Sequence, residues 1–355
     1  MIDNVPLSKF FTLPRSNWKP LTPIQEEGVK LFNEMVENEE LQYERIACPC
    51  CRMFSYDLLS QVDKYGIAQD IVICKNCGLV YNNPQLTEAS YIKVYDSVYR
   101  QIYMGYKMPS SEYNAYFQLI YEDRGKRYST YTEKMFSDDL DGKFVVEIGC
   151  GAGGILYRFK ELGAEVLGFD YDSQYINFGR KEYGLNLIAG DYQEYKFKTK
   201  PDLIILGHVL EHLIDYRSKL ATIQKIMKPD SILLIEVPSL LGRRFGWTLQ
   251  MAHTSYFTSN TLHYSLQTEG YKIVAAGTHG THLYCVATLD QDGVDPPISL
   301  DNEYQNTLSY LHMQERLGRW AYYKHHWFYP LIRPLEIANI LYRDPTRIKK
   351  RLQRG

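Results

Sequence analysis

Six apolar, largely β-branched runs recur between residues 144 and 288, and polar or helical stretches separate them. Each run is five to seven residues long, as expected for a strand buried in a sheet. The runs are Phe144–Ile148, Glu165–Phe169, Pro201–Leu206, Ile232–Val237, Tyr271–Ala276 and His282–Thr288. Residues 155–162 between the first two have a helical pattern. Strands that alternate with helices predict an α/β fold with a mainly parallel sheet.

A glycine-rich turn follows the first of these strands. Gly149, Gly151 and Gly153 come directly before the helix at 155–162, and Asp170 ends the next strand. Glycines at this point let the backbone pass close to a ligand that a Cβ would exclude. An acid at the end of the second strand can accept hydrogen bonds from both ribose hydroxyls. The unit therefore predicts a nucleotide-binding, Rossmann-like domain.

The rest of the chain divides around this domain. Thr22 and Pro23 are typical of a helix N-terminus, and we expect a helix from there to about residue 40. Residues 302–319 also have a helical pattern, and the end of the chain is strongly basic. We expect a helical leader (1–44), a cysteine-rich module (45–81), a helical linker or cap (82–140), the nucleotide-binding domain (141–290) and a helical basic tail (291–355).

Composition and charge limit the kinds of partner molecule that this protein is expected to bind. The 355 residues carry a net charge of −2, which gives no global case for a nucleic-acid partner. No apolar run approaches a membrane span and no signal peptide is recognisable, so we expect a cytoplasmic protein. The basic tail offers a peripheral contact with an anionic membrane surface or an acidic protein, although a docked helix with a solvated basic face is the favoured interpretation.

Five of the seven cysteines lie between residues 48 and 77. Cys48 and Cys51 form one C-x-x-C pair, and Cys74 and Cys77 form a second. Two such pairs complete a tetrahedral site of four thiolates, the geometry that zinc prefers, and four sulfurs leave no open position for chemistry. The pattern predicts a structural zinc ribbon. Between the pairs we expect short strands that bury little surface by themselves, so that the metal supplies much of the folding energy.

The segment Val145–Gly154 resembles motif I of the class I S-adenosylmethionine (SAM) methyltransferases. The resemblance places Glu147 near the SAM ammonium, Gly149, Cys150, Gly151 and Gly153 along the cofactor, and Asp170 on the ribose. Ala189-Gly-Asp191 matches the segment that places an acid on the adenine amino group. Tyr171, Tyr192 and His208, which follow the strand ends, complete the expected cofactor pocket.

Candidate catalytic groups follow the strands predicted at 201–206 and 232–237, whose carboxyl ends meet at the edge of the sheet where a ligand binds. Glu211 and His212 follow the first of these two strands, and His253 and Tyr256 follow the second. Methyl transfer needs an acceptor held in line and a group that takes its proton, and histidine suits that role because its pKa lies near neutrality. We expect His253 to be the base and His212 to orient the acceptor.

Residues 45–290 resemble the sugar C-methyltransferases that act on nucleotide-linked keto sugars. The match rests on Cys77–Tyr81, Val209–His212 and His253–Phe257. The family usually has Y-H-E-H up to the base histidine, whereas this chain has Gln250-Met-Ala-His253. A hydroxyl acceptor needs only one base, so we favour O-methylation of a sugar, nucleotide sugar or glycan. C-methylation of a nucleotide-linked keto sugar, RNA methylation and a non-catalytic scaffold are the alternatives.

Overall fold

A computed structural model describes residues 7, 21–105, 110–137, 139–242, 249–291, 293 and 296–323. The chain divides into two units, Met1–Leu308 and Ser309–Gly355. The three sheets of the described residues lie in the first unit. The predicted leader before residue 21 and the basic end of the tail after residue 323 lie outside the described residues, apart from residue 7.

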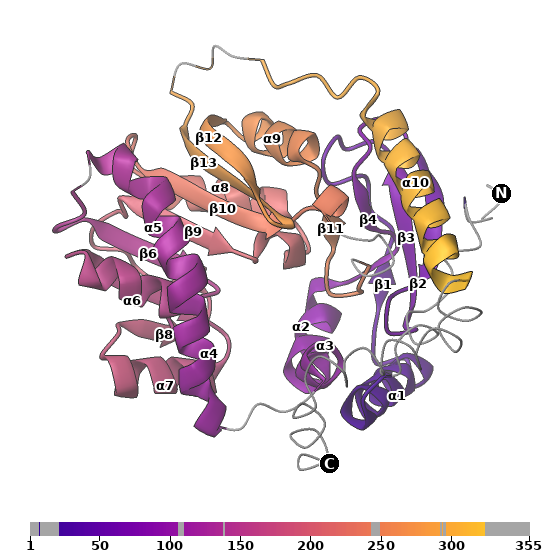
Figure 1. Ribbon diagram of the computed structural model, residues 1–355, viewed down its shortest axis with the longest axis horizontal. Coiled ribbons are helices and arrows are strands. Elements are labelled where there is room, and N and C mark those ends of the chain that lie inside the picture. Colours follow the sequence, from indigo (N-terminus) through magenta and orange to yellow (C-terminus); the bar gives the residue numbers. More distant parts are fainter. Residues whose placement is uncertain are drawn as a thin grey trace, which may run out of the picture. The chain divides into compact units, whose positions relative to one another are not determined.

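A seven-stranded mixed sheet forms the centre of the nucleotide-binding region (Figure 1). Its strand order is β12-β13-β10-β9-β6-β7-β8. β6 to β10 run parallel, and β13 and β12 add an antiparallel hairpin at one edge. The strands are β6 (Phe144–Ile148), β7 (Glu165–Asp170), β8 (Leu187–Ala189), β9 (Leu203–Gly207), β10 (Ile232–Pro238), β12 (Tyr271–His279) and β13 (His282–Leu289). The six strands predicted from the apolar runs are confirmed, and β8 is added.

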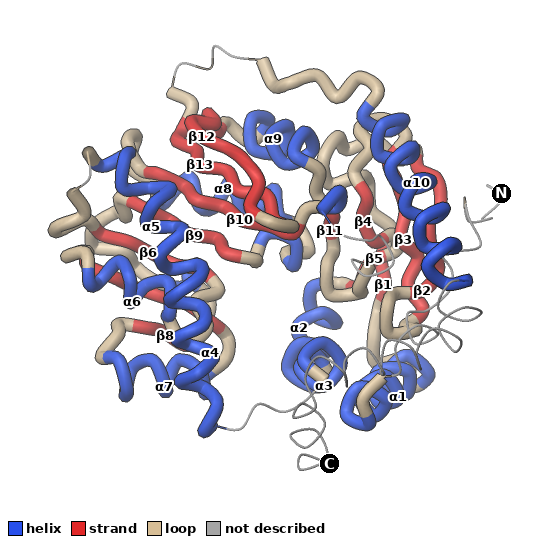
Figure 2. The backbone as a smooth tube through the Cα atoms, in the orientation of Figure 1, coloured by secondary structure: helices blue, strands red, loops and turns tan. Residues whose placement is uncertain are grey.

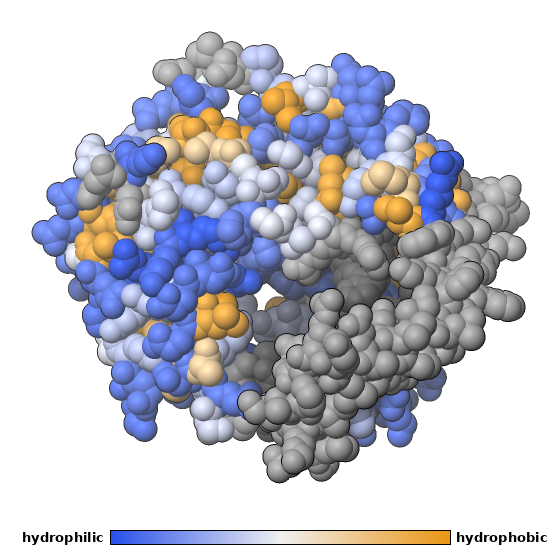
Figure 3. All heavy atoms as spheres, viewed as in Figure 1, coloured by the Kyte–Doolittle hydropathy of each residue, from blue (hydrophilic) through white to orange (hydrophobic). Residues whose placement is uncertain are grey.

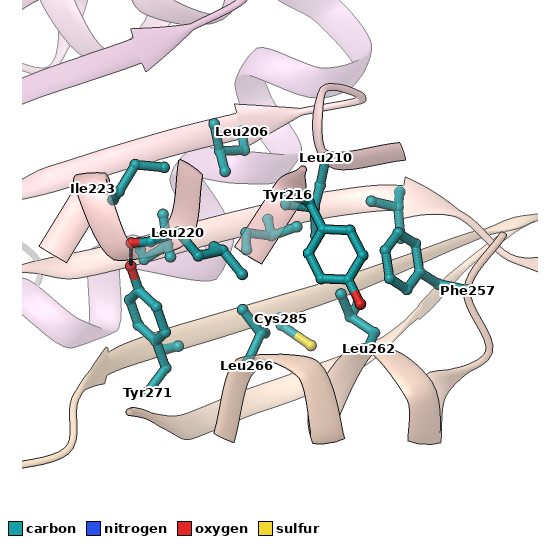
Figure 4. Close-up of a cluster of buried hydrophobic side chains, with 14 of the residues drawn as sticks. Leu206, Leu210, Tyr216, Leu220, Ile223, Phe257, Leu262, Leu266, Tyr271 and Cys285 are labelled. Atoms are coloured by element: carbon teal, nitrogen blue, oxygen red, sulfur yellow. Dashed lines mark hydrogen bonds between the residues drawn. The ribbon is translucent and has the colours of Figure 1, made fainter. Parts of the chain in front are cut away.

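Helices cover both faces of this sheet, because its strands are apolar on both sides. In β9, Leu203 and Ile205 face one hydrophobic core and Ile204 and Leu206 face the other. The first face packs against α4 (Tyr113–Ile120), α5 (Lys126–Glu133), α6 (Gly154–Glu161) and α7 (Ser173–Tyr183). The second packs against α8 (Tyr216–Ile226) and α9 (Ser259–Thr268). Figure 4 shows this second core, where the Tyr271 hydroxyl also donates to the carbonyl of Leu220. The Rossmann-like α/β prediction is confirmed.

The cysteine-rich segment belongs to a second, four-stranded antiparallel sheet of order β11-β4-β3-β2 (Figure 2). Its strands are β2 (Tyr56–Val62), β3 (Ala68–Cys74), β4 (Val80–Asn82) and β11 (Ser255–Tyr256), and β1 (Tyr43–Glu44) pairs with β5 (Gln85–Leu86) separately. Within the whole chain this segment is well buried, since Ile71, Val72 and Ile73 are at most 1% exposed. The expectation that the segment buries little surface by itself stays a prediction. The burial comes from packing against the rest of the chain, which the local sequence does not reveal.

The linker is helical, as predicted. It contains α2 (Glu88–Ser97), α3 (Tyr99–Met104), a 3₁₀ turn η3 (Ser110–Glu112), α4, a π-helical turn η4 (Tyr121–Gly125), α5 and a second 3₁₀ turn η5 (Lys134–Phe136). α1 (Pro23–Glu37) begins at Thr22, whose side chain and that of Gln25 form a capping box. Three more 3₁₀ turns, η6 (Tyr192–Glu194), η7 (Leu210–His212) and η8 (Leu240–Gly242), follow strands β8, β9 and β10.

The predicted helix near residues 302–319 is α10 (Glu303–Tyr323). Among the described residues, no helix is long and apolar enough to cross a membrane. On the face drawn in Figure 3, hydrophilic residues predominate and the hydrophobic ones form small separate areas.

Candidate active site

The site lies where the strand order reverses, between β6 and β9, at the carboxyl ends of the parallel strands. The turn after β6 has three glycines with positive φ, at 149, 151 and 153. A Cβ on Gly149 would lie 2.5 Å from Val209 Cγ2, whereas a Cβ on Gly151 would meet nothing within 4 Å. Gly149 therefore permits close packing of two loops, and Gly151 leaves open space beside the backbone.

Two adjoining cavities open at this point. One has a volume of about 440 Å³ and the other about 280 Å³, and both border on Gly149, Asp170, His208 and His212. Glu147, Cys150 and Gly151 line the larger cavity. Gly153 lines neither: a Cβ there would lie 2.6 Å from Leu185 Cδ1, so this glycine allows the helix α6 to pack against the sheet.

Asp170 is positioned by the backbone of two loops. Its Oδ2 accepts a hydrogen bond from the Gly151 N–H at 2.8 Å, and its Oδ1 accepts one from the Asp172 N–H at 2.8 Å. Burial raises the pKa of Asp170, although the Gly151 N–H and the charge of Arg100 oppose that shift. Each carboxylate oxygen keeps a second lone pair for a ligand hydroxyl.

The smaller cavity has a largely apolar wall with an acid at its end. Asp191 caps a 3₁₀ turn through the Gln193 N–H at 2.9 Å and accepts a hydrogen bond from the Tyr171 hydroxyl at 3.1 Å. Tyr192 also lines this cavity, but its hydroxyl lies 2.9 Å from Thr222 Oγ1, and the side chain belongs to the hydrophobic core. Tyr192 therefore offers a ring surface rather than a free hydroxyl.

Glu147 is a buried acid at the floor of the larger cavity. The residue is 2% exposed, and its Oε2 accepts no hydrogen bond. Burial raises its pKa well above the usual range, and the nearby charge of Arg124 opposes the shift. Arg124 lines the same cavity from the π-helical turn η4, an element that is frequent at functional sites. A cationic group in this cavity would satisfy the unpaired carboxylate oxygen.

The loop after β9 carries a chain of buried charges. His208 adopts a left-handed backbone (φ 61), unusual for a residue other than glycine. Its Nε2 lies 3.2 Å from Glu236 Oε1 and its Nδ1 lies 3.4 Å from Glu211 Oε1. Arg127 on α5 pairs with the other oxygen of Glu236. Burial alone would lower the pKa of His208, but the two carboxylates outweigh it and raise the pKa.

Neighbouring basic side chains lower the pKa of both Glu236 and Glu211, and His208 acts on both. Burial alone would raise the pKa of Glu236, yet hydrogen bonds from His208 and Arg127 lower it to about 2. Burial would likewise raise the pKa of Glu211, but His208 and His212 hold it below its usual range. Both carboxylates are therefore ionised at neutral pH, although the two oxygens of Glu211 are buried and accept no hydrogen bond from the described residues.

His212 and His253 converge on the larger cavity. Their ring centroids are 4.8 Å apart, and both rings line the cavity together with Glu211. His212 Nδ1 lies 2.9 Å from the Ala252 carbonyl, which can only accept, so Nδ1 carries the proton and Nε2 keeps its lone pair. Burial lowers the pKa of His212, which favours the neutral ring. The sequence prediction that these two histidines approach each other is confirmed.

Tyr256, by contrast, lines neither cavity. Its hydroxyl accepts from the Gln250 N–H at 3.0 Å and donates to the Gln250 carbonyl at 2.8 Å. The side chain therefore closes the loop that carries His253. This placement favours a packing role over the contact with substrate that the sequence suggested.

Among the residues that the structure describes, three groups of side chains have donor atoms close enough to share a metal ion. One is the predicted set Cys48, Cys51, Cys74 and Cys77; the others are His208, Glu236 and His282, and Glu211, His212 and His253. The pairing of Arg127 with Glu236 disfavours a cation in the second group, because that carboxylate is already neutralised. The four cysteines fit a metal ion best, because four thiolate sulfurs form the ligand set of a structural zinc site.

The thiols approach one another as the spacing predicts. Cys48 and Cys77 sulfurs are 3.5 Å apart, and Cys51 and Cys74 sulfurs are 3.4 Å apart. Cys50, which could compete as a ligand, instead points its thiol at the Thr261 carbonyl 4.0 Å away.

Sequence reasoning missed the side chains that the linker and hairpin bring to the larger cavity. They are Lys64, Tyr65, Tyr95, Tyr99, Arg100, Tyr103, Tyr116 and Arg124, and Gln250 joins them from the loop before His253. The one available signal was the density of tyrosines between residues 81 and 131, because tyrosine can pack its ring and still bind a polar ligand.

Comparison with known proteins agrees with this geometry. Residues 120–276 match a family model described as "Methyltransferase domain". A ubiquinone biosynthesis O-methyltransferase of Rhodopseudomonas palustris (strain TIE-1) is 30% identical over 101 residues, which are 27% of this chain and 40% of the relative. The enzyme of the same name from Actinobacillus pleuropneumoniae serotype 5b is 28% identical over 108 residues, covering 27% and 46%. The match thus spans less than half the length of these relatives.

Solved structures are more distant. The magnesium protoporphyrin IX methyltransferase ChlM from Synechocystis, with bound SAM, is 16% identical, covers 47% of this chain and 79% of its own, and has a TM-score of 0.38. The CcbJ methyltransferase from Streptomyces caelestis is 10% identical, covers 49% and 96%, and has a TM-score of 0.40. At these scores the likenesses carry no argument about substrate.

Proposed function

We propose that the chain is a class I SAM-dependent methyltransferase that methylates a hydroxyl group of a sugar, nucleotide sugar or glycan. The match of residues 120–276 to a methyltransferase-domain model supports the reaction type. The observation that carries the proposal is the convergence of His212 and His253 on a cavity that also contains the glycine turn and Glu147.

The residues of the turn and strand ends fit SAM. Glu147 has a buried oxygen without a hydrogen-bond donor, which suits the ammonium of the methionine part. Asp170 retains lone pairs for the ribose hydroxyls, and Asp191 with Tyr171 lies at the end of the smaller cavity, suited to the adenine. Cys150, Gly151 and His208 line the path between these groups. When bound, SAM supplies a methyl group already activated by its sulfonium.

His253 is the proposed proton acceptor. Its ring lies beside that of His212, and the acceptor hydroxyl would lie between this pair and the cofactor pocket. His212 would orient the acceptor by accepting a hydrogen bond at Nε2 from a second hydroxyl of the sugar, because its Nδ1 is committed to Ala252. The ionised carboxylate of Glu211, 3.9 Å from His212 Nε2, would stabilise positive charge as a proton arrives in this pair.

The acceptor class rests on the lining of the cavity and on the resemblance of His253–Phe257 to sugar methyltransferases. Tyrosine rings provide flat surfaces on which a sugar can lie, and tyrosine hydroxyls provide hydrogen bonds. Tyr95, Tyr99 and Tyr103 line the larger cavity as a row of rings packed on one another, and the Tyr103 hydroxyl accepts a hydrogen bond from the Ala252 N–H at 3.1 Å. C-methylation of a keto sugar is the second candidate, favoured by the same segment. It is weakened by Met251 and Ala252, which replace a histidine and a glutamate of that family's pattern.

We also propose one structural zinc ion on Cys48, Cys51, Cys74 and Cys77. The close approach of the four sulfurs supports it. The ion would join the turn before β2 to the turn that connects β3 with β4.

A panel of hydroxylated sugars, nucleotide sugars and nucleotide-linked keto sugars, assayed with SAM labelled in the methyl group, tests the proposal. With the acceptor so identified, His253→Gln should bind SAM normally and lose about 10²–10⁴ in turnover, the usual value of a general base. His212→Asn should mainly raise the acceptor KM. Turnover retained in His253→Gln, with an unchanged pH profile, would assign the proton to another group.

A further inference from the structure

The loop that carries His253 is held by the N-terminal sheet as well as by the turns that follow β9 and β10 of the seven-stranded sheet. Two residues after His253, β11 pairs with β4: Ser255 opposes Tyr81 and Tyr256 opposes Val80. Figure 1 shows β11 beside β4, at the edge of the sheet that the cysteine-rich segment forms. The register of this pairing decides which way residues 253–256 face.

Asp63, in the turn between β2 and β3, is the first side chain that reaches the loop. It is 1% exposed. Its Oδ1 accepts hydrogen bonds from the Tyr65 N–H at 2.7 Å and the Ile67 N–H at 3.0 Å, which close the turn. Its Oδ2 accepts a hydrogen bond from the Met251 N–H at 3.1 Å. One carboxylate thus joins the hairpin turn to the backbone two residues before His253.

Asn82, at the end of β4, is the second side chain of this sheet that reaches the loop. Its side-chain Nδ2 donates to the Met251 carbonyl at 2.9 Å, and its backbone N–H donates to the Thr254 carbonyl at 3.1 Å. Asp63 and Asn82 therefore hold both polar groups of Met251. The residue is 2% exposed, so these groups would be costly to leave unpaired.

The same loop is tied to the turn after β9. The Thr254 N–H donates to the Glu211 carbonyl at 2.8 Å, and the Ala252 carbonyl lies 2.9 Å from His212 Nδ1. A displacement of Met251 would therefore change the relation of His253 to His212. Base and acceptor must be aligned to a fraction of an ångström, and a misplacement of about 1 Å can cost about 10²-fold in rate.

We infer that Asp63 and Asn82 are positioning residues, which make the N-terminal hairpin sheet part of the catalytic apparatus by fixing His253 against His212. The inference rests on the proposed function of His253. It assigns to the cysteine-rich sheet a role in the reaction beyond that of a separately folded module.

Asp63→Asn is the sharpest variant. With its amide oxygen at the Oδ1 position it still accepts from Tyr65 and Ile67, but its NH₂ then faces the Met251 N–H, donor against donor. Asn82→Ala removes the donor to the Met251 carbonyl and leaves the backbone bond to Thr254, so it serves if Asp63→Asn folds poorly. Asp57→Asn is the matched control: Asp57 lies on β2 in the same sheet and pairs with Lys75 and Tyr304.

Two measurements are needed. The first is hydrogen exchange of residues 249–256 in the absence of an acceptor substrate, and the second is steady-state kinetics in its presence. Asp63→Asn and Asn82→Ala should both exchange faster than wild type in this segment, bind SAM with unchanged affinity, and lose about 10- to 100-fold in kcat. Asp57→Asn should match wild type in all three.

Hydrogen exchange of residues 249–256 that is unchanged in both variants would overturn the proposal that Asp63 and Asn82 hold this loop. Faster exchange with wild-type kcat would overturn the positioning role and leave the function of His253 intact. If instead His253→Gln keeps its turnover, the proposed base is wrong. The hydrogen-exchange result still reports separately on whether Asp63 and Asn82 hold the loop.

Discussion

The unpaired carboxylate of Glu147 makes SAM binding depend on pH. In the free protein, burial raises the pKa of Glu147 well above its usual range, so the group favours its protonated form. An ammonium beside Oε2 would favour the ionised form. Binding should therefore release a proton, and SAM affinity should rise with pH until the pH exceeds the pKa of the free protein.

The expected change in SAM affinity follows from the hydrogen bond that the ammonium would donate to the unpaired Oε2 of Glu147. A hydrogen bond between charged groups contributes about 1.5–3 kcal/mol, and each 1.4 kcal/mol is about tenfold in affinity. Glu147→Gln keeps the size and the carbonyl oxygen but removes the charge. We expect it to bind SAM about 10- to 150-fold more weakly, with little change with pH.

Isothermal calorimetry in two buffers of different ionisation enthalpy measures the released proton. Wild type should release close to one proton below the pKa of free Glu147, and Glu147→Gln should release none. Glu161→Gln is the matched control, because Glu161 lies on the exposed side of α6 and pairs with Tyr121 and Arg158. If wild type and Glu147→Gln release the same number of protons with the same affinity, Glu147 does not contact the ammonium.

Three further predictions follow from the same contacts. Asp170→Asn should weaken SAM binding by about 2–3 kcal/mol, because charge-assisted bonds to the ribose and the tie to Gly151 are both weakened; unchanged calorimetric affinity would reject this role. Metal analysis should find about one zinc per chain, and Cys74→Ser or a chelator should lower the melting temperature; a folded, metal-free protein of unchanged stability would argue against the site. Glu236→Gln should cost about 3–5 kcal/mol of unfolding free energy above pH 4.5, because it leaves Arg127 and His208 buried without their partner. Since the pKa of Glu236 is lowered to about 2, its contribution is present above pH 4.5 and lost as the pH falls towards 2, so the two proteins should converge in acid denaturation; a difference that stays constant with pH would contradict this.

Much of the donor pocket could be predicted from the sequence, because the determinants are local. Phe144–Ile148 is apolar at each position except Glu147, and the structure has β6 with those bounds. The glycine turn and Asp170 follow within one β-α-β unit, whose handedness and connection bring them together in nearly every protein that has one. Each C-x-x-C spacing is likewise local, whereas the approach of Cys48 to Cys77 and of Cys51 to Cys74, which are 29 and 23 residues apart, depends on the fold of the sheet.

The acceptor side could be predicted only in part. Sequence reasoning placed His212 and His253 together, since the ends of adjacent strands must meet. It did not reveal that Tyr256 turns its hydroxyl back to Gln250 or that Tyr192 packs in the core. Those outcomes depend on which hydrogen-bond partner is closest after folding, and no local pattern encodes that.

The sequence by itself determined the Rossmann-like domain, the glycine turn and the two C-x-x-C turns, because each follows from strand periodicity or from spacings of a few residues. Tertiary structure alone decided that β11 would pair with β4, that Asp63 would hold Met251, and that Arg127 would neutralise Glu236. These contacts join segments more than a hundred residues apart. Their partners are selected by burial, which leaves each buried polar group to be satisfied by whatever donor or acceptor the fold brings within reach.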